Sequence, residues 1–155
     1  MLHHKFEIVR SAPLRASITR APMYSCPISY GSSIHEVSIA YSLVELASQS
    51  AAEAGATRVR AVHLRLGALS GVVRGALGFG YEIANADTPL AGSALVMTEL
   101  PVSVYCARCQ EEVELASVQR FRCPQCDTPS GDIRQGRELE IESIEIDVPQ
   151  RTETP

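Results

Sequence analysis

The chain has 155 residues, a formal net charge of −4 at pH 7 and an apolar fraction of 45%, values typical of a globular protein of one domain or of one domain with a small satellite. Residues 1–33 carry a positive net charge, and because the whole chain is negative, the remaining residues are strongly acidic. An acidic body argues against nucleic acid as the main partner. The sequence also has no run of about 18 apolar residues, which excludes a predicted membrane-spanning helix.

Residues 1–33 differ from the rest of the chain in composition. They contain Arg and Ser, are almost free of acidic residues, and lack the apolar stretch of a secretory signal. Two interpretations stay open: a transit-peptide-like leader, or an extension that is disordered or not part of the native chain. We therefore leave this segment, and the tail at residues 149–155, out of the predicted fold.

The ordered part is expected to begin with a helix from residue 34 to about residue 54. Ser33 and Glu36 match a capping box, in which the serine hydroxyl and the glutamate carboxylate each bind a free amide at the helix start. Apolar residues then recur at helical spacing, and Gly55 is placed to end the helix. The predicted apolar stripe contains Val37, Ala40, Tyr41, Val44 and Ala47, with Leu43 and Leu46 beside it.

A strand, a second helix and a second strand are predicted next. Residues 59–66 alternate in polarity, with Val62 on the apolar side and His63 on the other. The helix covers residues 74–86, although it includes glycines that each cost about 1 kcal/mol relative to alanine. The second strand covers residues 94–100.

A third strand is predicted at residues 138–148, after a segment that carries four cysteines. Its apolar positions change side near Ser143, which indicates either a β-bulge or a strand that passes from one environment to another. The predicted fold is therefore α+β, with a small three-stranded sheet, two helices and an inserted four-cysteine module like a zinc ribbon.

Four of the five cysteines form two C-x-x-C pairs, Cys106 with Cys109 and Cys123 with Cys126, while Cys26 lies apart. Each pair turns two sulfurs toward one point, and two pairs complete a tetrahedral set of thiolates, which predicts zinc. Disulfides or an iron–sulfur cluster are the alternative. Because four thiolates leave no open coordination position, the zinc is expected to be structural. Clustered cysteines without a secretory signal also favour the reducing cytoplasm.

The sequence offers no recognisable set of catalytic residues. Lys5 is the only lysine, which excludes a P-loop and a lysine base in the body of the chain. His63 is expected on the strand face opposite the apolar one, and Glu82 is expected to be a solvated carboxylate on the second helix. We therefore expect that the protein is not an enzyme.

Several motifs accompany the cysteine pairs in a fixed order. Before the pairs come His35-Glu36-x-Ser38, then Val62-x-Leu64-x-Leu66-Gly67-x-Leu69-Ser70-Gly71, then Ala76-Leu77-x-Phe79-x-Tyr81-Glu82, and after them Glu140-Ile141-Glu142-Ser143-Ile144-Glu145. Together they resemble the HypA/HybF family, the nickel-delivery proteins of [NiFe]-hydrogenase maturation. The resemblance covers residues 34–148.

The resemblance implies a nickel-binding α/β domain at residues 34–104 and 130–148, with a zinc module at residues 105–129. It also implies that His35 binds nickel together with nearby backbone nitrogens and a free amine, donors that suit square-planar Ni(II). In the family this histidine follows the initiator methionine. Here Ile34 precedes it, inside the chain.

The partners implied by the resemblance are a HypB-like GTPase and the [NiFe] hydrogenase large subunit. Whether urease accessory proteins are also served is left open, and neither nucleic acid nor a membrane is expected. We expect a cytoplasmic monomer or weak dimer. The alternative is a zinc-ribbon interaction module of another assembly, which would bind zinc and not nickel.

Overall fold

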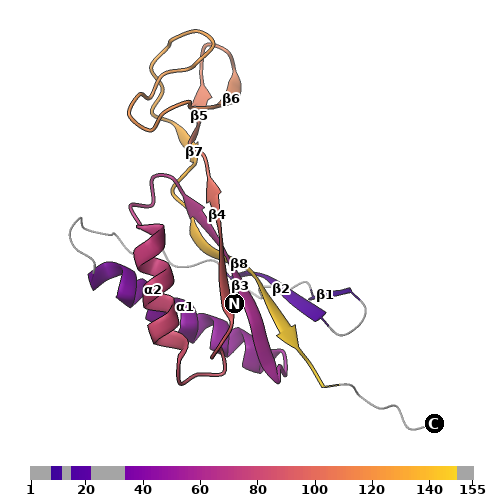
Figure 1. Ribbon diagram of the computed structural model, residues 1–155. Coiled ribbons are helices and arrows are strands. Elements are labelled where there is room, and N and C mark those ends of the chain that lie inside the picture. The colour runs from indigo at the N-terminus through magenta and orange to yellow at the C-terminus, as the bar shows by residue number, and fades with distance from the viewer. Residues whose placement is uncertain (1–7, 12–14, 22–33, 150–155) are drawn as a thin grey trace, which may run out of the picture. The chain divides into compact units, whose positions relative to one another are not determined.

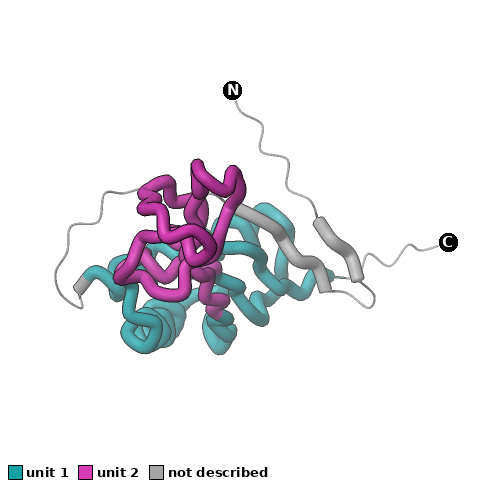
Figure 2. The backbone as a smooth tube through the Cα atoms, turned by 90° about the horizontal axis from the view of Figure 1, so that it is seen from above, with its two compact units in different colours: residues 1–64, 72–96, 140–155 teal, residues 65–71, 97–139 magenta. Residues whose placement is uncertain are grey.

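The computed structural model describes residues 8–11, 15–21 and 34–149, and the chain forms two compact units. The first unit contains the described residues up to Leu64, residues 72–96 and the residues from Glu140 onward; the second contains residues 65–71 and 97–139. Figure 1 labels the helices and strands, and Figure 2 colours the two units separately. The predictions that concern Cys26 and Ser33 fall outside the described residues.

A five-stranded sheet has the strand order β1-β2-β8-β3-β4. Its strands are β1 (Ile8–Ser11), β2 (Arg15–Ala21), β3 (Arg58–Gly67), β4 (Ala94–Leu100) and β8 (Leu139–Asp147). The predicted three-stranded sheet corresponds to β8, β3 and β4. It gains two strands because β2 pairs antiparallel with β8, from Arg15 opposite Asp147 to Ala21 opposite Ile141. An unpaired strand edge offers backbone groups to any segment that can align with it, which residues 15–21 do here.

The buried side chains of β8 change side along the strand, as predicted. Ile141 is buried on one side, whereas Ile144 and Ile146 are buried on the other. The pairing with β2 is regular across this point, with Thr19 opposite Ser143. Along this edge β8 therefore has no bulge, and the change of environment is the interpretation that holds.

Helix α1 (Ile34–Glu53) ends in the way that Gly55 predicts, with a φ of +69° at this glycine. The Gly55 N–H binds the Ala52 carbonyl at 3.0 Å, and the Ala56 N–H binds the Ala51 carbonyl at 2.9 Å. This pair of hydrogen bonds is a Schellman motif, which uses the last free carbonyls of the helix.

Tyr41 is the exception to the predicted apolar stripe of α1. Its side chain is 54% exposed, so the prediction that it lies on the buried stripe is wrong. A helix advances about 100° per residue, which puts residue 41 beside the inward stripe and not on it. The buried apolar residues of this helix are Ala40, Leu43, Val44, Ala47 and Ala51.

Helix α2 (Arg74–Asn85) packs on α1, and the two lie side by side in Figure 1. Their backbones approach closely at Gly80, where an added Cβ would lie 3.3 Å from both the Val37 Cα and the Ala40 Cβ. This close contact accounts for a glycine inside a helix, where it lowers helix propensity by about 1 kcal/mol. On the same helix Tyr81 is buried, and its hydroxyl shares a hydrogen bond of 2.7 Å with the Ser93 hydroxyl.

The second unit contains a three-stranded antiparallel sheet in the order β6-β5-β7. The strands are β5 (Ser103–Cys106), β6 (Glu111–Glu114) and β7 (Ile133–Gln135). Its core is a small cluster of buried residues, Val102, Val104, Cys106, Val113, Leu115 and Cys123. The unit reaches beyond the predicted module at residues 105–129, because β7 and residues 65–71 also belong to it.

Two backbone segments of the second unit meet at Gly67. The Leu69 N–H binds the Gly136 carbonyl at 2.6 Å, and a Cβ added to Gly67 would collide with the Gly136 carbonyl group. The same Cβ would lie 2.6 Å from the Arg137 nitrogen. Only glycine fits this contact.

Within the described parts of the chain, neither helix combines the length and the apolar character that a bilayer span requires.

Candidate metal centres

Each C-x-x-C pair lies in a tight turn that its backbone hydrogen bonds define. The Gln110 N–H binds the Cys106 carbonyl at 2.7 Å, and the Asp127 N–H binds the Cys123 carbonyl at 2.9 Å. Gln110 and Asp127 each follow the second cysteine of a pair, and their φ angles are +56° and +55°. They are the non-glycine residues with positive φ in the described part of the chain. The two turns therefore share one backbone geometry.

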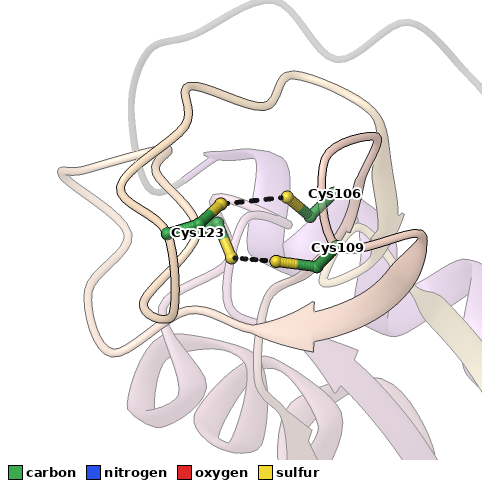
Figure 3. Close-up of side chains that lie close together, drawn as sticks. Cys106, Cys109 and Cys123 are labelled. Atoms are coloured by element: carbon green, nitrogen blue, oxygen red, sulfur yellow. Dashed lines mark hydrogen bonds between the residues drawn. The ribbon is translucent and has the colours of Figure 1, made fainter.

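The four sulfurs of these turns converge. All four Sγ atoms lie within 4.8 Å of one another, with 3.5 Å between Cys106 and Cys126 and 3.9 Å between Cys109 and Cys123. Figure 3 shows the side chains of Cys106, Cys109 and Cys123 directed toward a common point. The separations exceed the about 2.05 Å of a disulfide bond. They lie close to the sulfur–sulfur distance of about 3.8 Å that is expected in a tetrahedral site with Zn–S bonds of about 2.3 Å.

Hydrogen bonds favour the thiolate form at one of the four sulfurs. The Thr128 hydroxyl, 3.2 Å from the Cys126 Sγ, and then the Thr128 backbone N–H lower the pKa of Cys126 from 9.0 to about 6. Hydrogen bonding to Cys126, followed by desolvation, raises the pKa of Cys109 from 9.0 to about 12. The pKa values of Cys126 and Cys109 are thus shifted in opposite directions when no metal is bound. A bound cation would lower the pKa of both, because it stabilises all of the thiolates together. The donor set therefore fits a structural zinc.

His35 lies in the first turn of α1, and its side chain is exposed. Among the residues that the structure describes, the four cysteines are the one group of three or more His, Cys, Asp or Glu side chains close enough to share a metal. Around His35, the described side chains therefore form no such group.

Glu36, next to His35, has a role that the sequence did not predict. Its Oε1 accepts a hydrogen bond of 3.4 Å from the N–H of Val73, the residue that precedes α2 and has no side-chain cap of its own. Its Oε2 is buried and has no hydrogen-bond partner in the described structure. Glu36 therefore caps α2, whereas the predicted capping box of α1 involves Ser33 and lies outside the described residues. No local pattern could reveal this contact, because the two residues are 37 positions apart.

His63 and Glu82 lie as the sequence indicated. His63 is half-buried on β3, with its Nε2 3.0 Å from the Glu145 Oε1 on β8. Glu82 is exposed on α2. Neither lies among the four cysteines.

Fold and site define a small α+β protein with a separate unit built around four converging thiols. A family model described as hydrogenase/urease nickel incorporation, metallochaperone, HypA matches residues 34–146. A hydrogenase maturation factor HypA of Chloroflexus aurantiacus (strain J-10-fl) is 54% identical over 112 residues, which are 72% of this chain and 98% of that protein. The hydrogenase maturation factor HypA of Roseiflexus sp. (strain RS-1) is 50% identical over 121 residues, 77% of this chain and 98% of that protein. The chain therefore belongs to the HypA family.

Solved structures have the same fold. The solution structure of the Ni metallochaperone HypA from Helicobacter pylori aligns with a TM-score of 0.55 at 21% identity, over 74% of this chain and 98% of that chain. A second HypA solution structure aligns with a TM-score of 0.56 over 77% of this chain. The predicted α+β fold class and the predicted family are confirmed. The family is one of nickel metallochaperones for hydrogenase maturation, which favours this function over a zinc-ribbon interaction module.

Proposed function

We propose that this protein carries Ni(II) for the maturation of [NiFe] hydrogenase and holds a structural zinc between Cys106, Cys109, Cys123 and Cys126. The observation that carries the proposal is the family match over residues 34–146, which includes both the cysteine cluster and His35. Four thiolates fill a tetrahedral zinc site and leave no position for a second ligand. Nickel that must be taken up and released is therefore held elsewhere.

His35 is the nickel-binding side chain in this proposal. Its exposure makes the imidazole accessible both to the metal and to a recipient protein. The first amides of a helix have no carbonyl partner within the helix, so backbone nitrogens beside His35 are available as further donors. Imidazole together with such nitrogens suits Ni(II) in a square-planar arrangement.

The strength of nickel binding should depend on where the chain begins. A free amine next to His35 binds nickel without first losing an amide proton, whereas the peptide nitrogen of a longer chain must lose one. A short chain with Met in place of Ile34, followed directly by His35, should therefore bind nickel more tightly than the full chain of 155 residues.

Nickel titration of three proteins tests this proposal: the full chain, the short chain, and the short chain with His35→Ala. His63→Ala in the short chain is the matched control, because His63 is bound to Glu145 and not exposed at a helix start. Binding should be tightest in the short chain, lost with His35→Ala and kept with His63→Ala. Equal affinity of the full and short chains would show that the amine is not a ligand.

The recipient in this proposal is the hydrogenase large subunit, and the nucleotide-driven step belongs to a HypB-like GTPase. The family-matched residues contain no lysine and hence no P-loop lysine, so the purified chain should not hydrolyse GTP. Transfer should require contact between the two proteins. Nickel should therefore move from the loaded protein to the metal-free large subunit faster when the two are mixed than when a dialysis membrane separates them. A cytoplasmic location and a monomer or weak dimer belong to the same proposal, which does not decide between hydrogenase alone and hydrogenase together with urease accessory proteins.

A further inference from the structure

Two contacts fasten the first turn of α1 to α2. At one, the Glu36 carboxylate accepts the hydrogen bond from the Val73 N–H at the start of α2. At the other, α2 presents Gly80 directly to the backbone of α1, where an added Cβ would lie 3.3 Å from the Val37 Cα and 3.5 Å from the Glu36 carbonyl oxygen. Both contacts involve residues immediately after His35, and both lie within the first compact unit.

The burial of the Glu36 carboxylate is not explained by a gain in stability. The residue is 8% exposed, and of its two oxygens only Oε1 has a hydrogen-bond partner within the described structure. Burying a carboxylate oxygen without a partner costs free energy, and such a group in a native structure calls for a functional explanation. An alanine at this position would avoid this cost but would leave the Val73 N–H without the oxygen that accepts its hydrogen bond.

Gly80 points to the same conclusion from the other helix. Gly75 lies on α2 as well, but a Cβ added there would meet nothing within 4 Å. A methyl group at Gly80 would instead push the backbone at Val37 by a few tenths of an ångström. The fit between the helices is therefore tight at the turn that carries His35, and it is set by backbone atoms that cannot rotate away.

We infer that Glu36 and Gly80 are positioning residues for nickel binding: they hold the first turn of α1 against α2, so that His35 and the neighbouring backbone nitrogens keep one geometry. This inference rests on the proposed role of His35. The metal itself need not contact either residue. Loss of a group that orients a metal ligand typically lowers metal affinity by roughly 10- to 100-fold.

Amide hydrogen exchange in the full chain, loaded with zinc but free of nickel, tests this fastening. Gly80→Ala and Glu36→Ala should speed exchange in residues 35–40, while the exchange of β5 and β6 stays unchanged. Gly75→Ala and Glu45→Ala are the matched controls, because the first meets open space on the same helix and the second removes an exposed glutamate from α1. Both controls should exchange as the wild type does. Unchanged exchange in Gly80→Ala and Glu36→Ala would overturn the inference.

Nickel titration of the same full-chain variants then tests the positioning role. Gly80→Ala and Glu36→Ala should lower the His35-dependent nickel affinity by roughly 10-fold or more. They should also change the absorption spectrum of the nickel-saturated protein, which a loss of stability alone would not do. Glu36→Gln, which keeps the oxygen that accepts from the Val73 N–H, should restore both toward the wild type.

The outcomes separate this inference from the proposed function. If the wild type binds nickel through His35 and both variants bind it equally well with the same spectrum, the positioning role is wrong and the proposed function stands. If the wild type shows no nickel binding that His35→Ala removes, the proposed function fails, and the positioning role fails with it. Zinc content, measured in every sample, should stay at the wild-type value.

Discussion

Gln110 and Asp127 occupy equivalent places in the two C-x-x-C turns and adopt the same rare backbone conformation, with φ angles of +56° and +55°. In each turn this residue donates its N–H to the carbonyl of the first cysteine. This hydrogen bond closes the turn that carries both cysteines of a pair, and the left-handed residue lets the chain leave the turn directly after the second cysteine. The four-cysteine site thus depends on the backbone conformation of the two turns as well as on the four thiols.

Replacing Gln110 by valine should weaken the centre. A β-branched residue is strongly disfavoured at positive φ, and a left-handed residue costs roughly 1–2 kcal/mol even without branching. Gln110 already bears that cost, so we expect Gln110→Val to lower the stability of the zinc-loaded protein by the additional cost of the branched side chain, measured by thermal unfolding. Gln125→Val, at an exposed position with no positive φ, is the control and should change little. Equal effects of the two variants would rule out a special role for the turn.

Removing one thiol should release the zinc and unfold only part of the protein. With Cys123→Ser the metal loses one of four ligands, and metal binding supplies much of the folding free energy of small zinc units. We expect the zinc content to fall well below one per chain and proteolysis to increase in residues 97–139, while the helical circular dichroism persists. That persistence follows from the mostly aliphatic core of the first unit, because none of its described buried residues is a cysteine. A full zinc complement with unchanged proteolysis would refute the four-thiolate assignment.

Zinc binding should depend on pH through Cys126. Because the pKa of the Cys126 thiol is lowered to about 6, this group is a thiolate at neutral pH. Zinc binding therefore displaces a proton from Cys126 only below about pH 6. In the metal-free protein the same interaction stabilises the fold above the ordinary thiol pKa and is lost as the pH falls through about 6.

Thr128→Val removes the hydroxyl that is the main cause of this shift, so the pKa of Cys126 should rise toward 9.0. Between about pH 6 and pH 9, zinc binding to Thr128→Val should displace about one more proton than binding to the wild type, so its zinc affinity should fall more steeply as the pH is lowered, as measured by competition with a chelator. Thr128→Ser keeps the hydroxyl and should behave as the wild type. An identical pH dependence in the wild type and Thr128→Val would contradict the assignment of the cause.

Gly67→Ala should be far more disruptive than Gly75→Ala. Its new methyl group would meet the Gly136 carbonyl group and the Arg137 nitrogen, both of which are backbone and cannot rotate away. Overpacking of this kind typically costs about 1–3 kcal/mol. The loss should be visible in denaturant unfolding, and Gly75→Ala should cause no loss, because nothing lies within 4 Å of the added group.

The sequence predicts best what depends on short-range spacing. The ends of α1 and α2, the strand β4 and the pairing of four cysteines all follow from periodicity, caps and the C-x-x-C motif within a few residues. The cap that Glu36 provides to α2 and the contact of Gly67 with Gly136 could not be predicted, since both join segments far apart in the chain. The alignment of residues 15–21 with β8 is non-local in the same way.

Burial of single residues is the other limit of the sequence. The sequence did not reveal that the Glu36 carboxylate also reaches the contact between the helices, where it accepts from the Val73 N–H. The apolar stripe likewise included Tyr41, because a phenol ring counts as apolar in a pattern but its hydroxyl favours water. Packing against a second helix decides such positions, and the local sequence does not contain it.

The most direct test of the account is the metal content of the zinc-loaded protein after equilibrium dialysis against nickel. A nickel carrier of this family should hold close to one nickel in addition to one zinc, because the cysteine cluster and His35 are separate sites. His35→Ala should remove the nickel and leave the zinc, and Cys123→Ser should remove the zinc. A wild-type protein that retains zinc alone, or nickel binding that survives His35→Ala unchanged, would contradict the account.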